Sequence, residues 1–493
     1  MSDKIKFFFI LCCTYFLLLF CGITSELSLG DETLHYRFAK DIFLTGKRVA
    51  YDSLYLRYAH SNILLPYNSE PLWHILLSFL WKISGKPSFI IAQVYHTFYY
   101  FLLILLIYLI GEKLYGEKHG LYSVLILATM PAIIVFSVLF YLDIPVTVLT
   151  TFCFLLILQK RILLASIAMG LVYVTKRNGY FFLPFFIFLI IYQNNNNLKK
   201  IIKNLLCFFA FPLFFITYDV LWRESNLKIK VFSESRNISS FSSLDLIKDR
   251  LLVKDLNFRL TEYLNSYFSN PFDIIKYFGV VLLILLVLYF LKKRYEKKDF
   301  IFLWLPIGCY LIFFFYIFSF NSDIRYLIPI MPFLSILAAK SLFYVNKRIL
   351  KFLIILLCFL QFISTIIFVS IKRRISHEIK EGFVYLSQNT SKDSILLYPE
   401  YNILEGTERR FVWAGILNGS LGEIFWDTDR KTVEDIIKSL GINYIVVKKT
   451  RIYDDAKRRH FGGYPKSFMR RLQEFSFVEC VFDNKEISIW QVK

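Results

Sequence analysis

The sequence predicts an all-α polytopic membrane bundle of about eleven transmembrane helices, followed by a small C-terminal extracytoplasmic α/β domain. Three observations lead to this prediction. Hydrophobic residues make up 56% of the 493 residues, whereas soluble globular chains contain about 45–50%. These residues gather in runs long enough to cross a bilayer. The Lys and Arg residues behind the net charge of +20 cluster in short segments between the runs, as in cytoplasmic loops.

Charge and cysteine content argue against other classes of protein. A net charge of this size also suits a nucleic-acid site, but Lys and Arg in short loops between apolar runs favour a role in membrane orientation. Seven of the eight cysteines lie in apolar stretches, and only Cys480 lies in a polar region. No CxxC pair with the spacing of metal ligands occurs, so neither a zinc site nor a disulfide framework is predicted.

The apolar runs define the expected spans. The first begins after Lys4 and Lys6, and without a convincing cleavage signal it reads as an uncleaved helix that enters from the cytoplasm. Several runs between residues 141 and 192 are shorter than the ~20 residues of a straight crossing, so their boundaries stay open. The expected spans are residues 7–24, 89–110, 121–140, 145–158, 162–175, 180–192, 205–222, 274–291, 300–319, 326–343 and 350–371.

Basic residues set the expected orientation. A cytoplasmic N-terminus places the loops 111–120, 159–161, 193–204, 292–299 and 344–349 inside, and each of them carries at least two Lys or Arg residues. This is the bias that fixes topology in short loops. The N-terminus is therefore expected in the cytoplasm and the C-terminus outside it. The expected location is the plasma membrane, with the endoplasmic reticulum as the open alternative.

Three hydrophilic regions then face the extracytoplasmic side, namely 25–88, 223–273 and the tail 372–493. We expect a transmembrane domain over 1–371, which includes the first two regions, and an α/β domain over 372–493. Helical spacing over 31–44 and a short apolar stretch over 71–83 predict helices along the membrane interface. In the tail, a strand over 394–398, an amphipathic helix over 432–440 and a strand over 444–447 give the α/β prediction.

Acidic residues at the outer ends of spans are the first candidates for chemistry. Asp31 and Glu32 follow the first span, where they could act as a general base or a metal ligand, or where Asp31 could cap the next helix. Asp143, two residues after Tyr141, closes the third span. It is the only acid between Glu117 and Asp219. An acid at membrane depth indicates a functional site, although Asp143 could also be a cap.

Basic residues on the same side are the second group. Lys176 and Arg177 face outside in this topology, against the positive-inside bias, and a phosphate-bearing ligand would account for them. A wrong span count is the alternative. Arg325 lies at another outer helix end. Glu70 and His74 add an acid and a histidine, although a single histidine near aromatic residues is more often packed than a ligand.

Taken in order, these motifs resemble the GT-C class of membrane glycosyltransferases, closest to the protein O-mannosyltransferase and lipid A aminoarabinose transferase branch. The resemblance covers about residues 1–345. It rests on Asp31-Glu32, the Glu70-Pro71-Leu72 segment, Asp143, the Thr175-Lys176 motif with Pro184, and Arg325-Tyr326 with Pro329 and Pro332.

The resemblance implies inverting transfer of a sugar from a polyprenyl-phosphate donor to a hydroxyl acceptor on a lipid, glycan or protein at the outer membrane face. It implies catalytic roles for Asp31, Glu32 and Asp143. The cations Lys176, Arg177 and Arg325 fall where donor phosphate could be held.

Glu70, His74 and Tyr141 form the acceptor or accessory set. Many family members have Pro-Pro where this chain has Glu70-Pro71, which leaves the acceptor and a divalent metal ion open. The expected partners are the donor, the acceptor and the lipid bilayer, without nucleic acid. Asp31, Asp143 and Lys176 are expected to share one cavity that opens outside.

Two other functions remain open from the sequence. A transporter or flippase of lipid-linked sugars would show paired charges at mid-membrane and repeated halves, and neither is clear. A glycan polymerase or ligase would use a lipid-linked oligosaccharide. The acidic pair directly after the first span favours the glycosyltransferase.

Overall fold

The computed structural model divides into two compact units, each described separately here. The helical unit comprises Met1–Thr24, Ser69–Leu76 and Ser88–Val369, and the α/β unit comprises Ser25–Asn68, Leu77–Pro87 and Ser370–Lys493. The structure describes residues 3–27, 30–49, 51–58, 63–66, 71–194, 197–227, 271–291, 296–317, 324–345, 348–414, 424–425, 429–455 and 463–493.

Each expected span falls on one or two helices of the helical unit. Proline sets several boundaries, because it has no backbone N–H and favours the first helical turn. Pro131 begins α6 in this way. The helices are α1 (Asp3–Ile23), α4 (Phe89–Tyr115), α5 (Glu117–Ala128), α6 (Pro131–Val138), α7 (Asp143–Leu158), α8 (Ile162–Tyr173), η1 (Arg177–Phe182), α9 (Leu183–Gln193), α10 (Leu198–Leu227), α13 (Pro271–Phe278), α14 (Val280–Leu291), α15 (Lys297–Asp299), η2 (Phe300–Trp304), α16 (Leu305–Ile317), η3 (Ile324–Ile330), α17 (Met331–Tyr344) and α18 (Arg348–Lys372).

Fewer helices meet the length of a straight crossing than the sequence predicts. Among the described residues, five helices are long and apolar enough to span a membrane, or six if α5 and α6, bent by 65° to each other, form one span. The apolar helices α7, α8 and α14 have fewer than 18 residues. The chain is mostly helical and multi-pass, while the count of about eleven stays a prediction.

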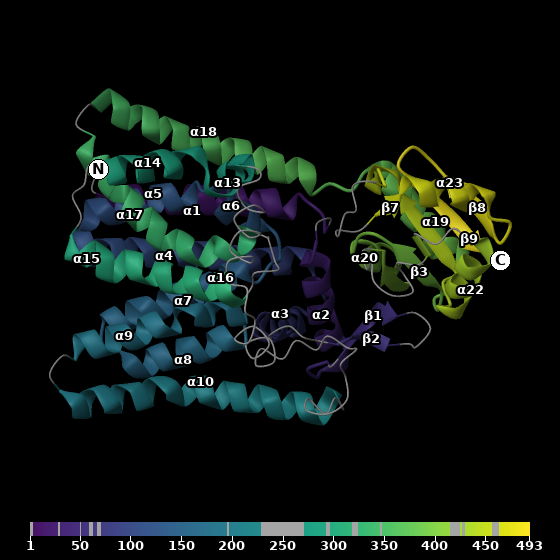
Figure 1. Ribbon diagram of the computed structural model, residues 1–493. Helices are drawn as coiled ribbons and strands as arrows, with labels where there is room; N and C mark the ends of the chain where they lie inside the picture. Colours follow the sequence, from purple (N-terminus) through teal and green to yellow (C-terminus); the bar gives the residue numbers. More distant parts are fainter. Residues whose placement is uncertain are drawn as a thin grey trace. The chain divides into compact units, whose positions relative to one another are not determined.

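Close helix packing holds the helical unit together. Helix α8 packs against both α7 and α10, and α4 packs against α5 (Figure 1). A Cβ atom on Gly111 of α4 would lie only 2.8 Å from the Cα atom of Gly120 in α5. The two glycines therefore let the backbones approach closely, as small residues do in membrane helix pairs.

The core of the α/β unit is a seven-stranded sheet with the order β2-β1-β4-β3-β5-β9-β8. Strands β1, β4, β3 and β5 are parallel, while β2, β9 and β8 pair antiparallel at the two edges. The strands are β1 (Tyr51–Tyr58), β2 (Ile63–Pro66), β3 (Ile395–Tyr398), β4 (Arg410–Trp413), β5 (Tyr444–Lys448), β8 (Val478–Asp483) and β9 (Ile487–Val492), and a separate two-stranded sheet joins β6 (Ile452–Tyr453) to β7 (Tyr464–Pro465).

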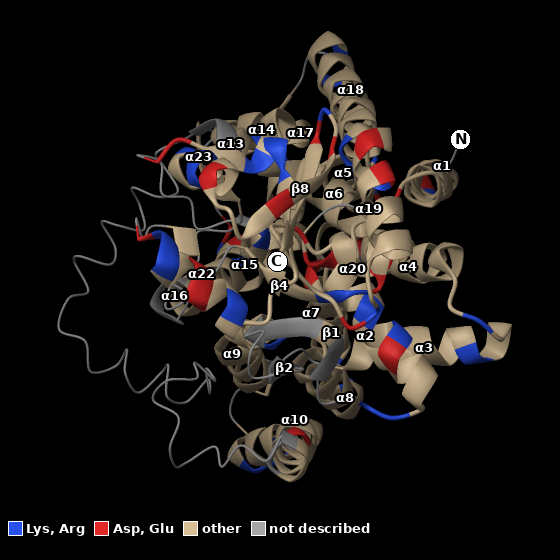
Figure 2. Cartoon of the chain, turned by 90° about the vertical axis from the view of Figure 1, so that its right-hand side faces the viewer, with Lys and Arg blue, Asp and Glu red and all other residues tan. Residues whose placement is uncertain are grey.

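Helices cover both faces of this sheet. Alternate residues of each strand point to opposite faces, so Leu397 and Leu396 enter different cores. Helices α22 (Arg430–Ser439) and α23 (Lys466–Glu474) cover the first face, and α2 (Glu32–Thr45), α19 (His377–Asn389) and α20 (Ile403–Thr407) cover the second. Acidic and basic residues of α19, α22 and α23 appear as red and blue bands in Figure 2.

The sequence located the tail elements but not the full extent of their domain. Strands β3 and β5 and helix α22 occur where a strand, a strand and a helix were expected. Helices α2 and α3 (Leu72–Ser84) lie over the two helical stretches of the first loop. However, the expected domain boundary kept residues 25–88 with the transmembrane part, whereas most of this loop belongs to the α/β unit.

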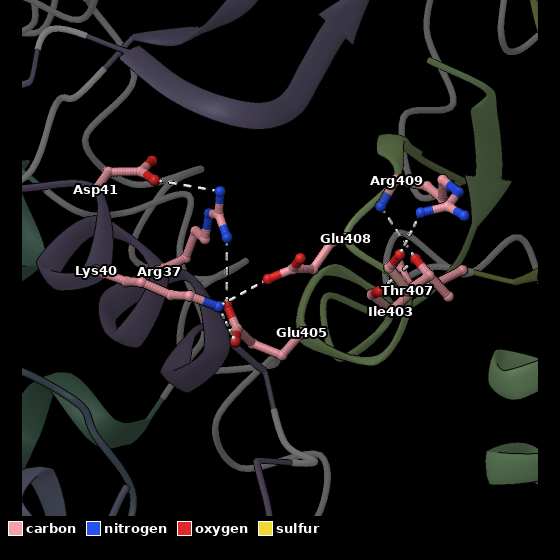
Figure 3. Close-up of polar contacts among 8 residues, drawn as sticks. All are labelled: Arg37, Lys40, Asp41, Ile403, Glu405, Thr407, Glu408 and Arg409. Atoms are coloured by element: carbon pink, nitrogen blue, oxygen red, sulfur yellow. Dashed lines mark hydrogen bonds and ion pairs between the residues drawn. The ribbon is translucent and has the colours of Figure 1, made fainter. Parts of the chain in front are cut away.

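Ion pairs attach the first loop to the tail. The ammonium group of Lys40 in α2 lies 3.0 Å from Glu405 and 2.9 Å from Glu408, at the end of α20 (Figure 3). Arg37, one turn earlier, bonds Asp41 at 3.2 Å. Burial opposes the charge of Lys40, but its two carboxylate partners outweigh burial and raise its pKa. The hydrogen bond from Lys40 lowers the pKa of Glu408.

Candidate active site

The candidate site of the helical unit lies at the starts of α7, η1 and η3. Asp143 is the first residue of α7 and is completely buried. Lys176 lies between α8 and η1, with an extended backbone at the N-cap of η1. Its Nζ atom lies 2.5 Å from Oδ1 of Asp143. A buried charge is stable only when it is paired, so this ion pair explains how both residues are accommodated.

Aromatic rings surround the cations of the site. Nζ of Lys176 lies 4.7 Å from the ring centroid of Tyr326 in η3. The guanidinium of Arg325 lies 4.9 Å from the ring of Tyr141 and 5.2 Å from that of Tyr326. Such cation–π contacts hold a positive charge in a region of low dielectric constant. Asp143, Lys176, Arg325 and Tyr141, singled out from the sequence, therefore lie together.

One oxygen of this ion pair is left without a bond. Oδ2 of Asp143 is buried and has no hydrogen-bond partner among the described residues. A buried carboxylate oxygen without a donor is costly. The site can therefore accept a hydrogen bond from a ligand at this atom.

Arg177 forms an ion pair with an acid from α10. Its Nη2 atom lies 3.0 Å from Oδ2 of Asp219 in α10. The hydroxyl of Tyr173 donates to the same oxygen at 3.3 Å, and the Arg177 guanidinium stacks 5.1 Å from the Tyr173 ring. Asp219 thus neutralises the charge of Arg177, which is predicted to face donor phosphate. One local signal indicates this partner, since Asp219 is an acid in an apolar stretch.

A polar chain positions Tyr326. The amide of Asn178 donates to the hydroxyl of Tyr310 at 3.1 Å, and that hydroxyl donates to the backbone carbonyl of Tyr326 at 2.5 Å. This chain joins η1, α16 and η3 behind the ring that Lys176 faces. Sequence reasoning missed Tyr310, because nothing local distinguishes it from the other aromatic residues of the spans.

The accessory residues lie in different surroundings. His74 is completely buried in α3, and its ring meets that of Trp73 edge to face at 5.3 Å. The backbone N–H of Leu72 donates to the carbonyl of Val174 at 2.9 Å. The start of α3 is thus joined to the segment just before Lys176. Glu70 lies outside the described residues.

The acidic pair after the first span lies in the α/β unit. Asp31 occupies the N-cap position of α2, but its side chain makes no capping hydrogen bond. Glu32 is completely buried and receives two hydrogen bonds from Arg373, at 2.7 Å and 3.5 Å. Arg373, also fully buried, donates to Ser25 at 2.6 Å. The expected meeting of Asp31 with Asp143 and Lys176 stays a prediction, because these residues belong to different units.

The described residues contain no cluster of metal ligands. Across the described ranges, no group of three or more His, Cys, Asp or Glu side chains could hold a metal ion. Oδ1 of Asp143 is paired with the ammonium group of Lys176. A divalent metal ion stays a prediction from the sequence.

A known protein family matches the part of the chain that contains the Asp143–Lys176 pair. Residues 68–218 match the family model described as dolichyl-phosphate-mannose-protein mannosyltransferase. This stretch contains Asp143, Lys176 and Arg177. No curated protein sequence matches the chain significantly.

Solved structures share the fold at low sequence identity. The apo oligosaccharyltransferase of Archaeoglobus fulgidus is 13% identical with a TM-score of 0.61, over 90% of this chain and 69% of that one. The ArnT structure from Cupriavidus metallidurans bound to undecaprenyl phosphate is 12% identical with a TM-score of 0.58, over 99% of this chain and 97% of that one. The archaeal oligosaccharyltransferase has also been solved with an inhibitory peptide and a dolichol-phosphate, at 12% identity and a TM-score of 0.59, over 90% and 69%.

Proposed function

We propose that this chain, which has the fold of the GT-C membrane glycosyltransferases, transfers a sugar from a polyprenyl-phosphate donor to a hydroxyl acceptor at the outer membrane face. The observation that carries the proposal is the buried Asp143–Lys176 ion pair, with Arg325 held on aromatic rings beside it. The family match over 68–218 and the lipid phosphates bound in similar structures support the choice of donor.

Lys176 and Arg325 are the proposed donor-phosphate ligands. When the bond between the anomeric carbon and the phosphate oxygen breaks, the leaving lipid phosphate takes the electron pair and gains negative charge. Cations already in place stabilise that charge without reorganising. Tyr326, which faces both cations, keeps them in position. Arg177, balanced by Asp219, is a positioning residue for this segment.

Asp31 is the proposed general base. The acceptor oxygen attacks the anomeric carbon on the face opposite the phosphate, and its proton passes to the carboxylate, which inverts the configuration. Glu32 is poorly suited to this role, because both of its carboxylate oxygens accept hydrogen bonds from the buried guanidinium of Arg373 and are therefore directed away from an acceptor. The resemblance places Asp31 where the family has its catalytic carboxylate, so Asp31 is the proposed base of the pair.

The test is sugar transfer by the purified protein from a synthetic polyprenyl-phosphate sugar. We expect Lys176→Ala to lower kcat/KM for the donor about 10- to 100-fold, since a charge-assisted contact to phosphate is lost. Lys113→Ala, which changes an exposed lysine of the helical unit, should keep normal activity. Equal activity of both variants would contradict the proposed donor site.

The same assay separates transfer from transport. A transferase joins the labelled sugar to the acceptor and leaves free polyprenyl phosphate. A flippase moves the intact donor across a liposome membrane and forms no new glycosidic bond. Movement of intact donor without any transferred sugar would refute the proposed activity.

A further inference from the structure

The α/β unit contains a polar cavity of about 370 Å³ at the carboxyl ends of the neighbouring strands β3 and β5. Its walls come from the end of α18, the start of α19, the residues that follow β3 and the residues that follow β5. The main polar side chains are Lys372, Arg374, Glu400, Asn402, Lys448 and Arg451. None of them belongs to the proposed transfer site.

The sheet topology explains why a cavity forms there. Strands β3, β4 and β5 are parallel in the order β4-β3-β5. The chain leaves β3 through α20 on one face to reach β4, and then returns through α22 on the other face to reach β5. Connections that diverge from neighbouring parallel strands leave a crevice at their carboxyl ends, where ligands of open α/β sheets bind.

The charge of the cavity favours an anion. Four cationic side chains face a single carboxylate. Glu400 accepts from Lys448 at 2.8 Å and 2.9 Å and from Nε of Arg451 at 2.9 Å. These contacts hold both cations in place. They use only Nε of Arg451, so its two Nη groups do not take part in the contact with Glu400. Arg374 is exposed, and its side chain forms no ion pair within the described part of the chain.

Asn402 adds a second requirement. The residue is only 5% exposed, and its amide nitrogen donates to Glu400 at 3.4 Å. This bond fixes the amide orientation, and Oδ1 is left without a hydrogen-bond partner among the described residues. A buried acceptor without a donor is costly. The ligand that suits the cavity therefore carries a hydroxyl or N–H donor next to its anionic group.

The position in the chain indicates where such a ligand could come from. Lys372 is the last residue of α18, in which residues 352–371 include no charged side chain. This helix belongs to a candidate membrane span, and the charged end of such a span is expected at the level of lipid headgroups. A hydroxylated headgroup such as phosphatidylglycerol and a soluble hydroxylated phosphate share the required chemistry.

We propose that this cavity binds a phosphate group that carries a neighbouring hydroxyl, with Arg374, Lys448 and Arg451 facing the phosphate and Asn402 accepting from the hydroxyl. The site is separate from the Asp143–Lys176 pair and does not depend on the transfer reaction. It gives the α/β unit a ligand-binding role of its own.

The test uses the full chain in phosphatidylcholine nanodiscs. Calorimetric titration with glycerol 3-phosphate measures a soluble ligand, and native mass spectrometry after addition of phosphatidylglycerol counts bound lipid. We expect Arg374→Ala to weaken binding of the preferred probe about tenfold, through loss of a charge-assisted contact. Asn402→Leu should weaken it similarly. Arg430→Ala, which removes another exposed arginine of the same unit, is the matched control and should bind normally.

The two probes separate the sources of the phosphate. Saturable binding of glycerol 3-phosphate that Arg374→Ala weakens supports the site with a soluble ligand. Retention of phosphatidylglycerol alone, lost in Arg374→Ala, supports it with a lipid headgroup. Binding of neither probe, or equal binding by wild type, Arg374→Ala and Asn402→Leu, would overturn the proposal whether or not the protein transfers sugar.

Discussion

At the scale of single residues, Asp143 and Lys176 are expected to act as one unit. Removing Lys176 leaves the fully buried Asp143 unpaired, and removing Asp143 leaves the partly buried ammonium group of Lys176 without its carboxylate. The Asp143→Asn and Lys176→Gln variants should therefore each lose most of the transfer rate. Residues in one ion pair show coupling of about 0.5–3 kcal/mol. The double variant should therefore be little worse than the poorer single variant. The measurement is kcat/KM for all four proteins, and losses that simply multiply would show that the residues act independently.

Asp31 and Glu32 should differ in what their removal changes. Asp31→Asn keeps the size of the side chain but removes the proton acceptor, and loss of a general base costs about 10²–10⁴-fold in rate. Its unfolding temperature should stay close to normal, because asparagine is as favourable as aspartate at the N-cap position that Asp31 occupies. Transfer rate and thermal unfolding, measured on the same preparation, test both parts. Near-normal turnover in Asp31→Asn would remove this residue from the mechanism.

Glu32→Gln should instead destabilise the protein. It leaves Arg373, which is fully buried, without its carboxylate, and breaking a buried ion pair from one side costs about 3–5 kcal/mol. The unfolding temperature should fall. The double variant Glu32→Leu, Arg373→Met removes both charges and should recover much of the loss. No change in unfolding temperature for Glu32→Gln would mean that the ion pair is not structural.

The site residues that sequence reasoning found share one property. Asp143, Lys176 and Arg325 are charged residues in or beside apolar runs, where an unpaired charge is costly and therefore indicates a functional site. The partners of Arg177 and Tyr326 were missed for a physical reason. Asp219 and Tyr310 come close to them only through the packing of α10 and α16, and local sequence does not encode which distant helix will be a neighbour.

At the scale of elements, the contact of α2 with α20 should depend on pH. Glu408 has a lowered pKa, so its contribution to stability is present above the unfolded value of about 4.3 and is lost as pH falls through the lowered pKa. Lys40 has a raised pKa, so its contribution is present below its ordinary value and is lost at strongly alkaline pH. Hydrogen exchange of α2 should therefore speed up more than that of α22 on acidification. Lys40→Met should abolish this difference.

The α4–α5 contact offers a second test at this scale. A methyl group on Gly111 would lie 2.8 Å from the backbone of α5, so Gly111→Ala must push the helices apart and lower the unfolding temperature. Gly308 in α16 has no atom within 4 Å of the position of a Cβ atom. Gly308→Ala is therefore the matched control, and it should be neutral or slightly stabilising. Equal unfolding temperatures of the two variants would contradict close packing at Gly111.

The positions of helices and strands were easier to predict from the sequence than which of them pair or pack together. Apolar runs, and the Pro and Gly residues that end them, are local signals, so the apolar helices of the helical unit and strands β3 and β5 lie close to their expected places. The break between α5 and α6 was missed, although Pro131 marks it, because the apolar run continues through it. The pairing of β1 with β4 was also missed, since no local signal connects segments this far apart in the chain.

At the scale of the whole molecule, the orientation remains to be measured. The basic loops predict a cytoplasmic N-terminus and an extracytoplasmic tail. In a chain without native cysteines, a cysteine at position 430 should react with a membrane-impermeant thiol reagent added from outside. A cysteine at position 199 should react only after the membrane is opened. The reverse pattern would invert the topology and place both proposed sites on the cytoplasmic side.

Pairing of β1 with β4 also constrains how the protein is made. Residues 51–58 emerge early in synthesis, whereas their partner strand, 410–413, emerges about 350 residues later, which at 5–20 residues per second is a delay of about 20–70 s. Strand β1 can pair with β2 at once, but throughout that time its other side has its backbone hydrogen bonds unmade, which is the condition under which strands pair with wrong partners. The cell therefore has to shield this segment until the last fifth of the chain arrives, and premature termination would leave it permanently exposed to proteolysis.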